Sequence, residues 1–236
     1  MGNQIALITG ASKGIGFEVA KQLGQQGIMV LLSARTKADA EEAAGKLKEQ
    51  GIESMGVELE VTNAGHIAAL AQWIGEKYGK LDILVNNAGI WAETSGVEGA
   101  FESTFEVNTF APYHITEALL PLLLKSDAGR IVNQSSALGS IEFLKSNELA
   151  QQIATPAYAA SKAALNMLTV YWANKYEGTH LKINTVHPGL VKTRMGEKKP
   201  NCLLKKVRRR QSVMPHCLRT DLQADSTIWI TSFPGK

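Results

Sequence analysis

The chain has 236 residues, of which 44% are hydrophobic and 20% charged, and its formal net charge is +3 at pH 7. No apolar run is long enough for a membrane span, the start lacks a secretory signal, and two cysteines, Cys202 and Cys217, cannot build a disulfide framework, so we expect a soluble, cytoplasmic protein. Residues 197–222 contain eight Lys or Arg and two acidic residues, which gives this segment a charge of +6 and leaves the rest of the chain with a charge of −3. We therefore expect neither nucleic acid nor membrane as a partner.

Apolar runs and helical patterns alternate along most of the chain, which is typical of βαβ units in a parallel sheet with helices on both faces. The apolar runs predict strands over 5–9, 29–34, 53–58, 83–86, 130–134 and 182–187. The segments between them predict helices over 16–26, 37–50, 65–78, within 101–125, and over 156–176. We therefore predict an α/β fold with a Rossmann-like, doubly wound parallel sheet of six strands.

Three glycines, Gly10, Gly14 and Gly16, lie where the first predicted strand becomes the first predicted helix. Glycine lets the backbone turn sharply and approach a pyrophosphate, whose charge is favoured by the N–H groups and dipole at the helix start. The spacing is G-x-x-x-G-x-G rather than the more familiar G-x-G-x-x-G. The stretch predicts a dinucleotide site, and a tight turn without a ligand is the alternative.

The end of the second predicted strand indicates which dinucleotide binds. It reads Leu-Ser-Ala-Arg over 32–35, without the carboxylate that would bind the ribose 2′-hydroxyl of NAD. Arg35, through its planar fork, and Lys13, as a point charge, would together hold a 2′-phosphate. NADPH/NADP+ is the predicted cofactor, and the alternative is that both residues are solvated surface cations.

Polar and small residues follow the fourth and fifth predicted strands, as Asn-Asn-Ala-Gly at 86–89 and as the pair Ser135 and Ser136. Tyr158 and Lys162 stand four residues apart on the last predicted helix and therefore share a face. An ammonium there favours the phenolate and adapts the tyrosine to proton transfer. Such a pair is commonly only a surface contact, but the serines reach the same edge of the sheet, which favours an active site.

Taken together, TGASKGIG, NNAG, the serine pair and YAASK make the sequence resemble the short-chain dehydrogenase/reductases, and more narrowly their NADPH-dependent carbonyl reductases. Motif order and spacing match from about residue 5 to about residue 195. The resemblance implies an oxidoreductase that reduces an aldehyde or ketone to an alcohol, with a small carbonyl or alcohol molecule as its partner. The alternative is a catalytically weak dinucleotide-binding protein with an altered C-terminus.

The resemblance implies a catalytic tetrad of Asn108, Ser136, Tyr158 and Lys162. Asn108 matches an asparagine whose backbone position holds a water in a proton relay, although a buried structural amide is also compatible with it. Ser136 matches the serine that polarises the carbonyl. Tyr158 matches the proton donor, and Lys162 matches the residue that binds the nicotinamide ribose and lowers the pKa of the tyrosine.

The resemblance also implies residues that contact the cofactor and the substrate. The cofactor set is Gly10, Ser12, Lys13, Gly14, Ile15, Gly16, Arg35, Glu60, Val61, Asn87, Ala88, Gly89, Tyr158, Lys162, Pro188, Gly189, Val191 and Thr193. Glu60 stands where the family usually has Asp, which leaves its contact with adenine open. The substrate set is Ser136, Trp91, Phe143, His187 and Leu190, of which His187 is also compatible with a structural role. The histidines show no ligand spacing, so we predict no metal.

Two segments depart from the family pattern. Ser136 and Tyr158 are 22 positions apart, more than in most of the family, so 138–155 is expected to include an inserted loop that either covers the pocket or is a surface excursion. Residues 1–196 are predicted to form the dinucleotide-binding and catalytic domain. Residues 197–236 form an atypical basic C-terminal segment of that domain without the usual seventh strand, and the oligomeric state stays open. A contact of 205–210 with nucleic acid or an acidic partner is a weaker alternative to a solvated basic run.

Overall fold

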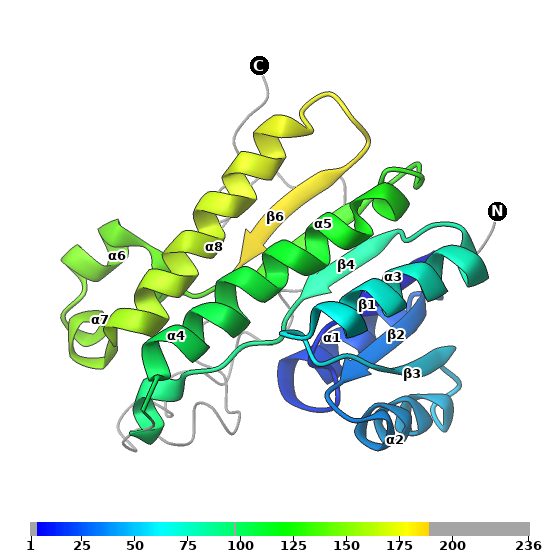
Figure 1. The fold of residues 1–236 in the computed structure, drawn as a ribbon, viewed down its shortest axis with the longest axis horizontal. Coiled ribbons are helices and arrows are strands. Elements are labelled where there is room, and N and C mark those ends of the chain that lie inside the picture. The colour runs from blue at the N-terminus through cyan, green and yellow to red at the C-terminus, as the bar shows by residue number, and fades with distance from the viewer. Residues whose placement is uncertain (1–3, 97, 189–236) are drawn as a thin grey trace.

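Six parallel strands form one sheet in the computed structural model, which describes residues 4–96 and 98–188 (Figure 1). They are β1 (Ile5–Ile8), β2 (Met29–Ala34), β3 (Ser54–Glu58), β4 (Ile83–Asn86), β5 (Arg130–Gln134) and β6 (Lys182–Val186). The order is β3-β2-β1-β4-β5-β6, so the winding reverses between β1 and β4. In doubly wound folds, ligands bind outside the carboxyl ends of the strands at such a reversal. The predicted fold is confirmed, and each predicted strand matches to within one residue at each end.

The helices cover both faces of the sheet. They are α1 (Gly14–Gly24), α2 (Lys37–Lys48), α3 (Ala64–Tyr78), α4 (Ala100–Phe105), α5 (Ala111–Leu123), α6 (Ile141–Ser146), α7 (Glu148–Ile153) and α8 (Pro156–Lys175). Apolar side chains of α1 and α2 pack on one face of the strands, and those of α3, α5 and α8 pack on the other (Figure 1). The central strands β1, β2 and β4 are buried along their whole length and are largely apolar, as expected for strands covered on both faces, which is why the sequence predicts them as apolar runs. Within the described ranges, no helix is long and apolar enough to cross a lipid bilayer.

The long helix predicted within 101–125 is interrupted. A π-helical turn, η2 (Glu106–Phe110), separates α4 from α5, and the N–H of Ala111 donates to the carbonyl of Glu106, five residues back. Pro112 lies at the start of α5 and has no N–H with which to complete the α-helical bond to the carbonyl of Asn108. The wider turn is therefore a local consequence of the proline, and it falls on a residue of the predicted tetrad.

The segment inserted between Ser136 and Tyr158 is structured. It comprises the short turn η3 (Ala137–Gly139) followed by α6 and α7, which lie beside the amino end of α8 (Figure 1). Leu138 and Ala150 are buried against Tyr158 and Ala159 of that helix. The insertion therefore packs against the predicted catalytic residue, which favours a cover over the pocket rather than a surface excursion.

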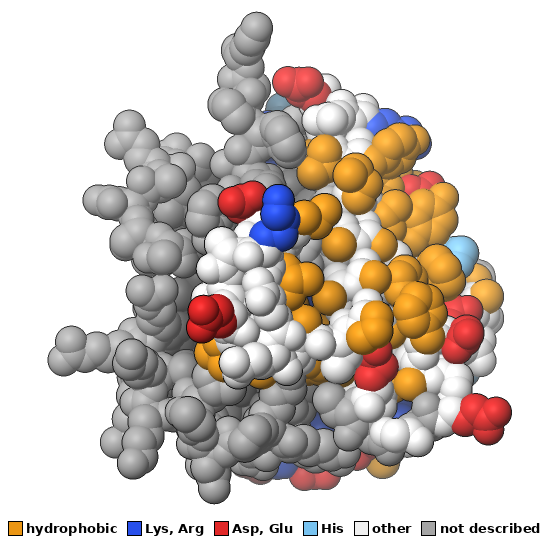
Figure 2. All heavy atoms as spheres, turned by 90° about the vertical axis from the view of Figure 1, so that its left-hand side faces the viewer, with side chains coloured by type: hydrophobic (Ala, Val, Ile, Leu, Met, Phe, Trp, Pro, Cys, Tyr) orange, Lys and Arg blue, Asp and Glu red, His pale blue; other side chains and the backbone are white. Residues whose placement is uncertain are grey.

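Exposed apolar side chains gather on one face of the molecule (Figure 2). The largest on α4, η2, α5 and α8 are Phe101, Phe110, Tyr113, Met167 and Tyr171, each at least 38% exposed. Contiguous exposed apolar surface of this kind is typical of surfaces that associate with another part of a protein or with a partner.

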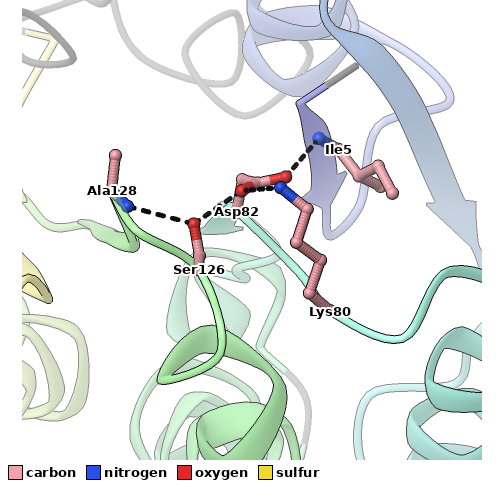
Figure 3. A network of polar contacts seen from close by, with 5 residues as sticks. All are labelled: Ile5, Lys80, Asp82, Ser126 and Ala128. Atoms are coloured by element: carbon pink, nitrogen blue, oxygen red, sulfur yellow. Dashed lines mark hydrogen bonds and ion pairs between the residues drawn. The ribbon is translucent and has the colours of Figure 1, made fainter. Parts of the chain in front are cut away.

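A buried carboxylate ties the amino ends of the central strands together (Figure 3). Asp82, which is 2% exposed, accepts hydrogen bonds from the backbone N–H of Ile5 at 2.9 Å, from Lys80 Nζ at 2.8 Å and from the hydroxyl of Ser126. The Ser126 oxygen in turn accepts from the N–H of Ala128 at 3.2 Å. One side chain thus joins the starts of β1 and β4 to the turn before β5, at the end of the sheet opposite the carboxyl ends of the strands.

We expect Asp82→Ala to lower the free energy of unfolding by about 2–4 kcal/mol, because it leaves several buried donors without an acceptor. Urea denaturation followed by circular dichroism measures the change. Asp127→Ala removes the same charge from an exposed neighbouring position, and we expect it to shift stability by about 0.5 kcal/mol or less. Equal losses in the two variants would contradict the assigned role of Asp82.

Candidate active site

The glycine turn between β1 and α1 closes tightly against the loop that follows β4. Gly10 and Gly14 have φ angles of +62° and +64°, which disfavour any residue with a Cβ. A Cβ on Gly16 would lie 2.5 Å from Nδ2 of Asn87 and 2.8 Å from the carbonyl oxygen of Gly10. The glycines therefore serve the close packing of two backbone segments and leave the first turn of α1 open. Ile15, predicted to touch the cofactor, packs partly against the apolar core.

Thr9, the residue after β1, holds the two loops together, and the sequence analysis missed it. Its buried hydroxyl oxygen accepts hydrogen bonds from the N–H groups of Asn87 and Ala88, both at 3.0 Å. The Asn87 amide donates to the carbonyls of Thr9 at 2.8 Å and Gly10 at 3.1 Å. The sign of this role in the sequence is a single hydroxyl residue at the end of an apolar strand. Asn87 and Ala88 thus lie against the glycine turn, and their contact with a cofactor stays a prediction.

The end of β2 also lies beside the glycine turn, since the N–H of Ala11 donates to the carbonyl of Ser33 at 2.8 Å. Lys13 directly precedes α1 and makes no side-chain cap bond, while Ser12 is half-buried. Lys13 and Arg35 are both exposed, and neither forms an ion pair with another residue of 4–96 or 98–188. Two cations are therefore available at the place where a 2′-phosphate was predicted.

Glu60 follows β3, and its carboxylate is engaged locally. Its Oε1 accepts from the hydroxyl of Thr62 at 3.3 Å, and its N–H donates to Nδ1 of His66 at 3.2 Å. Val61 beside it is buried in the core. A direct contact of Glu60 with adenine therefore competes with its bond to Thr62, and the contact stays a prediction.

Three residues of the predicted tetrad meet at the carboxyl edge of the sheet. Ser136 follows β5, and its side chain lies close enough to Tyr158 of α8 to act on the pKa of the phenol. Lys162, one helical turn further on, is buried, and its Nζ lies 5.8 Å from the centre of the Tyr158 ring. The ammonium donates to the carbonyl of Gln134 at 2.8 Å. Serine, tyrosine and lysine thus form one cluster, with the lysine held by the last residue of β5.

Burial controls the protonation of this cluster. It raises the pKa of Tyr158 above 10.0, and the hydrogen bond with Ser136 acts in the opposite direction without outweighing it. It lowers the pKa of Lys162 from 10.5 to about 8. The net pKa of Tyr158 is raised because desolvation of the phenolate outweighs what favours the charged form. The lowering by Lys162 that the resemblance implies stays a prediction.

Asn108, the fourth predicted member, is fully buried in the π-helical turn and ties down the loop after β4. Its side chain accepts from the N–H of Ile90 and donates to the carbonyl of Ile90, both at 2.9 Å, and it also donates to the hydroxyl of Ser161 at 3.1 Å. A Cβ on Gly89 would lie 3.2 Å from the Asn108 oxygen and 3.5 Å from Lys162 Nζ. The side chain of Asn108 thus acts as a structural amide, and the water-holding role of its backbone stays a prediction.

The predicted substrate residues divide into two groups. Trp91 stacks on Tyr158, with ring centroids 4.2 Å apart and planes 10° apart, and Phe143 of α6 packs against the same apolar cluster. His187, of the substrate set, and Pro188, of the cofactor set, follow β6 and are half-buried. Burial lowers the pKa of His187, and its ring nitrogens have no hydrogen-bond partner among the described residues. Four predicted residues, Gly189, Leu190, Val191 and Thr193, lie outside the described residues, as does the segment 197–236.

Sequence reasoning also missed Glu93 and Thr155, which meet at the start of α8. Pro156 marked the beginning of that helix, and Thr155 before it is a common cap residue. No pattern in the sequence indicates that a glutamate 62 positions earlier approaches the same point.

Comparison with known proteins adds relatives to this geometry. The sequence profile of a family described as short chain dehydrogenase matches residues 4–202. Short-chain dehydrogenase/reductase 1 of Saponaria officinalis is 36% identical over 252 residues, covering 80% of this chain and 82% of that protein. Salutaridine reductase of Papaver somniferum is 33% identical over 260 residues, covering 80% of this chain and 83% of that protein.

Solved structures agree with these matches. The structure of salutaridine reductase superposes with a TM-score of 0.71 at 32% identity, covering 82% of this chain and 89% of that one. A short chain dehydrogenase from Shigella flexneri, solved in complex with NADP, gives a TM-score of 0.72 at 31% identity, covering 83% and 81%.

We expect Lys162→Met to raise the free energy of unfolding at pH 7 by about 2 kcal/mol. A pKa lowered from 10.5 to about 8 corresponds to a cost of about 3 kcal/mol for the buried ammonium, at about 1.4 kcal/mol per pKa unit. Loss of the hydrogen bond to Gln134 offsets about 1 kcal/mol of this gain.

The stabilisation expected for Lys162→Met depends on pH. Below pH 8 the lysine is protonated in the folded and unfolded states, and the full cost applies; between about 8 and 10.5 only the unfolded state keeps the proton, so the cost shrinks as pH rises. Denaturant titrations at several pH values measure it, with Lys145→Met as an exposed control. A stability difference that is constant from pH 7 to pH 10 would contradict the assignment.

Proposed function

Since this chain belongs to the short-chain dehydrogenase/reductase family of oxidoreductases, we propose that it reduces an aldehyde or ketone to an alcohol with NADPH, reversibly. The observation that carries the proposal is the convergence of Ser136, Tyr158 and the buried ammonium of Lys162 at the carboxyl edge of the sheet, with Lys162 Nζ 5.8 Å from the centre of the Tyr158 ring. The relative named salutaridine reductase supports the direction of the reaction, and the relative whose structure contains NADP supports the cofactor.

The residues around the glycine turn fit a dinucleotide. The turn admits no Cβ at Gly16, and the 11-residue helix α1 begins at Gly14 with no acidic residue in its first turn, so its first N–H groups suit a pyrophosphate. Arg35 and Lys13 would hold the 2′-phosphate, and Lys162 the nicotinamide ribose. The cofactor, when bound, supplies the hydride that the carbonyl carbon receives.

Side chains of the protein would donate the proton and stabilise the charges that its transfer creates. Tyr158 keeps its proton at neutral pH because burial raises its pKa, and it gives this proton to the substrate oxygen as that oxygen becomes an alkoxide. Ser136 donates a hydrogen bond to the same oxygen. Lys162 is charged below a pH of about 8 and stabilises the phenolate that Tyr158 becomes.

Residues 1–196 would form the dinucleotide-binding and catalytic domain, which the family match over 4–202 supports. The basic segment 197–236 would belong to the same domain. We place the protein in the cytoplasm, acting on a small carbonyl or alcohol molecule.

Tyr158→Phe tests the enzymatic function. We expect kcat for NADPH oxidation with a panel of aldehydes and ketones to fall about 100-fold or more, since general acid catalysis is removed, while the Kd for NADPH changes by less than about 3-fold. Tyr171→Phe, an exposed position on the same helix, is the control. NADPH binding by the wild-type protein without turnover of any carbonyl would favour a catalytically weak dinucleotide-binding protein.

Arg35→Asp tests the cofactor assignment. The new carboxylate repels a 2′-phosphate and accepts a hydrogen bond from a ribose 2′-hydroxyl, so the ratio of kcat/KM with NADPH to that with NADH should fall by about 100-fold or more. Lys37→Asp makes the same charge change two positions later, at an exposed position of α2. It should leave the ratio within about 3-fold of the wild-type value. If Arg35→Asp retains the wild-type preference, Arg35 does not select the cofactor.

A further inference from the structure

An acidic side chain from a distant loop caps the helix that carries Tyr158. Glu93 lies in the turn η1 (Ala92–Ser95), after the loop that follows β4. Its Oε1 accepts from the N–H of Ala157 at 3.0 Å, and its Oε2 accepts from the N–H of Tyr158 at 2.8 Å. Because α8 begins with Pro156, which has no N–H, these are the first two free donors of the helix.

Two further side chains complete this arrangement. Thr155 precedes α8 but makes no cap bond of its own; its hydroxyl instead donates to Oε2 of Glu93. The same hydroxyl oxygen accepts from Nε1 of Trp91 at 2.6 Å, and the Trp91 ring stacks on the ring of Tyr158. Trp91, Glu93 and Thr155, which we call the Glu93 clamp, thus hold Tyr158 by its backbone N–H and by its ring.

The charge of Glu93 suits this position. Burial raises the pKa of its carboxyl. The hydrogen bonds from Thr155, Ala157 and Tyr158 together lower the pKa by more than burial raises it, so the net pKa lies below the ordinary value. The group is therefore ionised at neutral pH, opposite the positive end of the 20-residue helix α8.

The loop that carries the clamp is fixed at its other end as well. Asn87 is bonded to the glycine turn, and Ile90 is bonded on both backbone groups to Asn108. The chain from Asn87 to Glu93 therefore links the predicted cofactor cradle to the amino end of α8 through direct hydrogen bonds.

We propose that Glu93, acting with Thr155 and Trp91, is a positioning residue that sets the place and ring plane of Tyr158 relative to Ser136 and to the cofactor cradle. The proposal rests on the proposed function, in which Tyr158 is the proton donor. A catalytic acid displaced by about 1 Å loses up to about 100-fold in rate, so a clamp on its backbone and ring acts on kcat rather than on binding.

Two conservative variants test the proposal. Glu93→Gln replaces one acceptor oxygen by an NH2 group, and Thr155→Val keeps the shape but removes the hydroxyl. We expect each to lower kcat for carbonyl reduction about 10-fold, with KM for the carbonyl and Kd for NADPH within about 3-fold of wild type. Thr155→Ser restores the hydroxyl and should recover most of kcat. Glu148→Gln, at the exposed start of α7, is the matched control.

Hydrogen–deuterium exchange of the amides of Ala157 and Tyr158 provides a readout independent of catalysis. Loss of one of the two acceptor oxygens in Glu93→Gln should speed exchange of at least one of these amides about 10-fold, with no change at the carboxyl end of α8. Unchanged exchange would overturn the clamp, and faster exchange with unchanged kcat would overturn its positioning role. A wild-type protein without turnover would overturn the proposed function and the catalytic purpose of the clamp, while the exchange experiment still decides whether the contacts exist.

Discussion

The close approach of two loops at the carboxyl ends of β1 and β4 is the constraint on which the site depends. Gly16 leaves no room for a Cβ against the Asn87 amide, and the Thr9 hydroxyl accepts from two successive N–H groups of the second loop. This contact fixes where α1 begins and where the loop after β4 begins. The same loop then binds Asn108 and reaches the start of α8. The predicted cofactor cradle and the helix that carries Tyr158 are therefore positioned from one junction.

Buried polar side chains keep the sheet and its covering helices in register behind this junction. Asn86 donates to Thr116 of α5 at 3.1 Å and to Asn133 of β5 at 2.8 Å, and Asn133 donates to Thr169 of α8 at 2.8 Å. Apolar contacts alone are non-directional and tolerate sliding, whereas buried polar groups are costly unless they meet specific partners. The network therefore favours one placement of α5 and α8 on the strands. It complements Asp82, which joins the strands at their other end.

The sequence predicted the scaffold well because its signals are local. Strands buried on both faces read as apolar runs, and the single-turn spacing of Tyr158 and Lys162 put both on one face of α8. The π-helical turn escaped prediction because the apolar pattern continues through it, although Pro112 was a local sign. Glu93 escaped because its contacts span more than sixty residues. The net rise of the Tyr158 pKa could not be read from the sequence, because burial is a property of the packed fold, including α6 and α7.

The electrostatics of the site follow from where its charges are placed. Lys162 is buried as a cation, desolvation alone accounts for its lowered pKa, and no acidic residue of 4–96 or 98–188 pairs with it. The nearby carboxylate of Glu93 is instead committed to the N–H groups at the start of α8. Among the residues that the structure describes, the ammonium thus has no acidic partner. In the proposed reaction, proton donation by Tyr158 would create a negative charge beside it, so the ammonium would stabilise the reacting state more than the resting one, which is the requirement for catalysis.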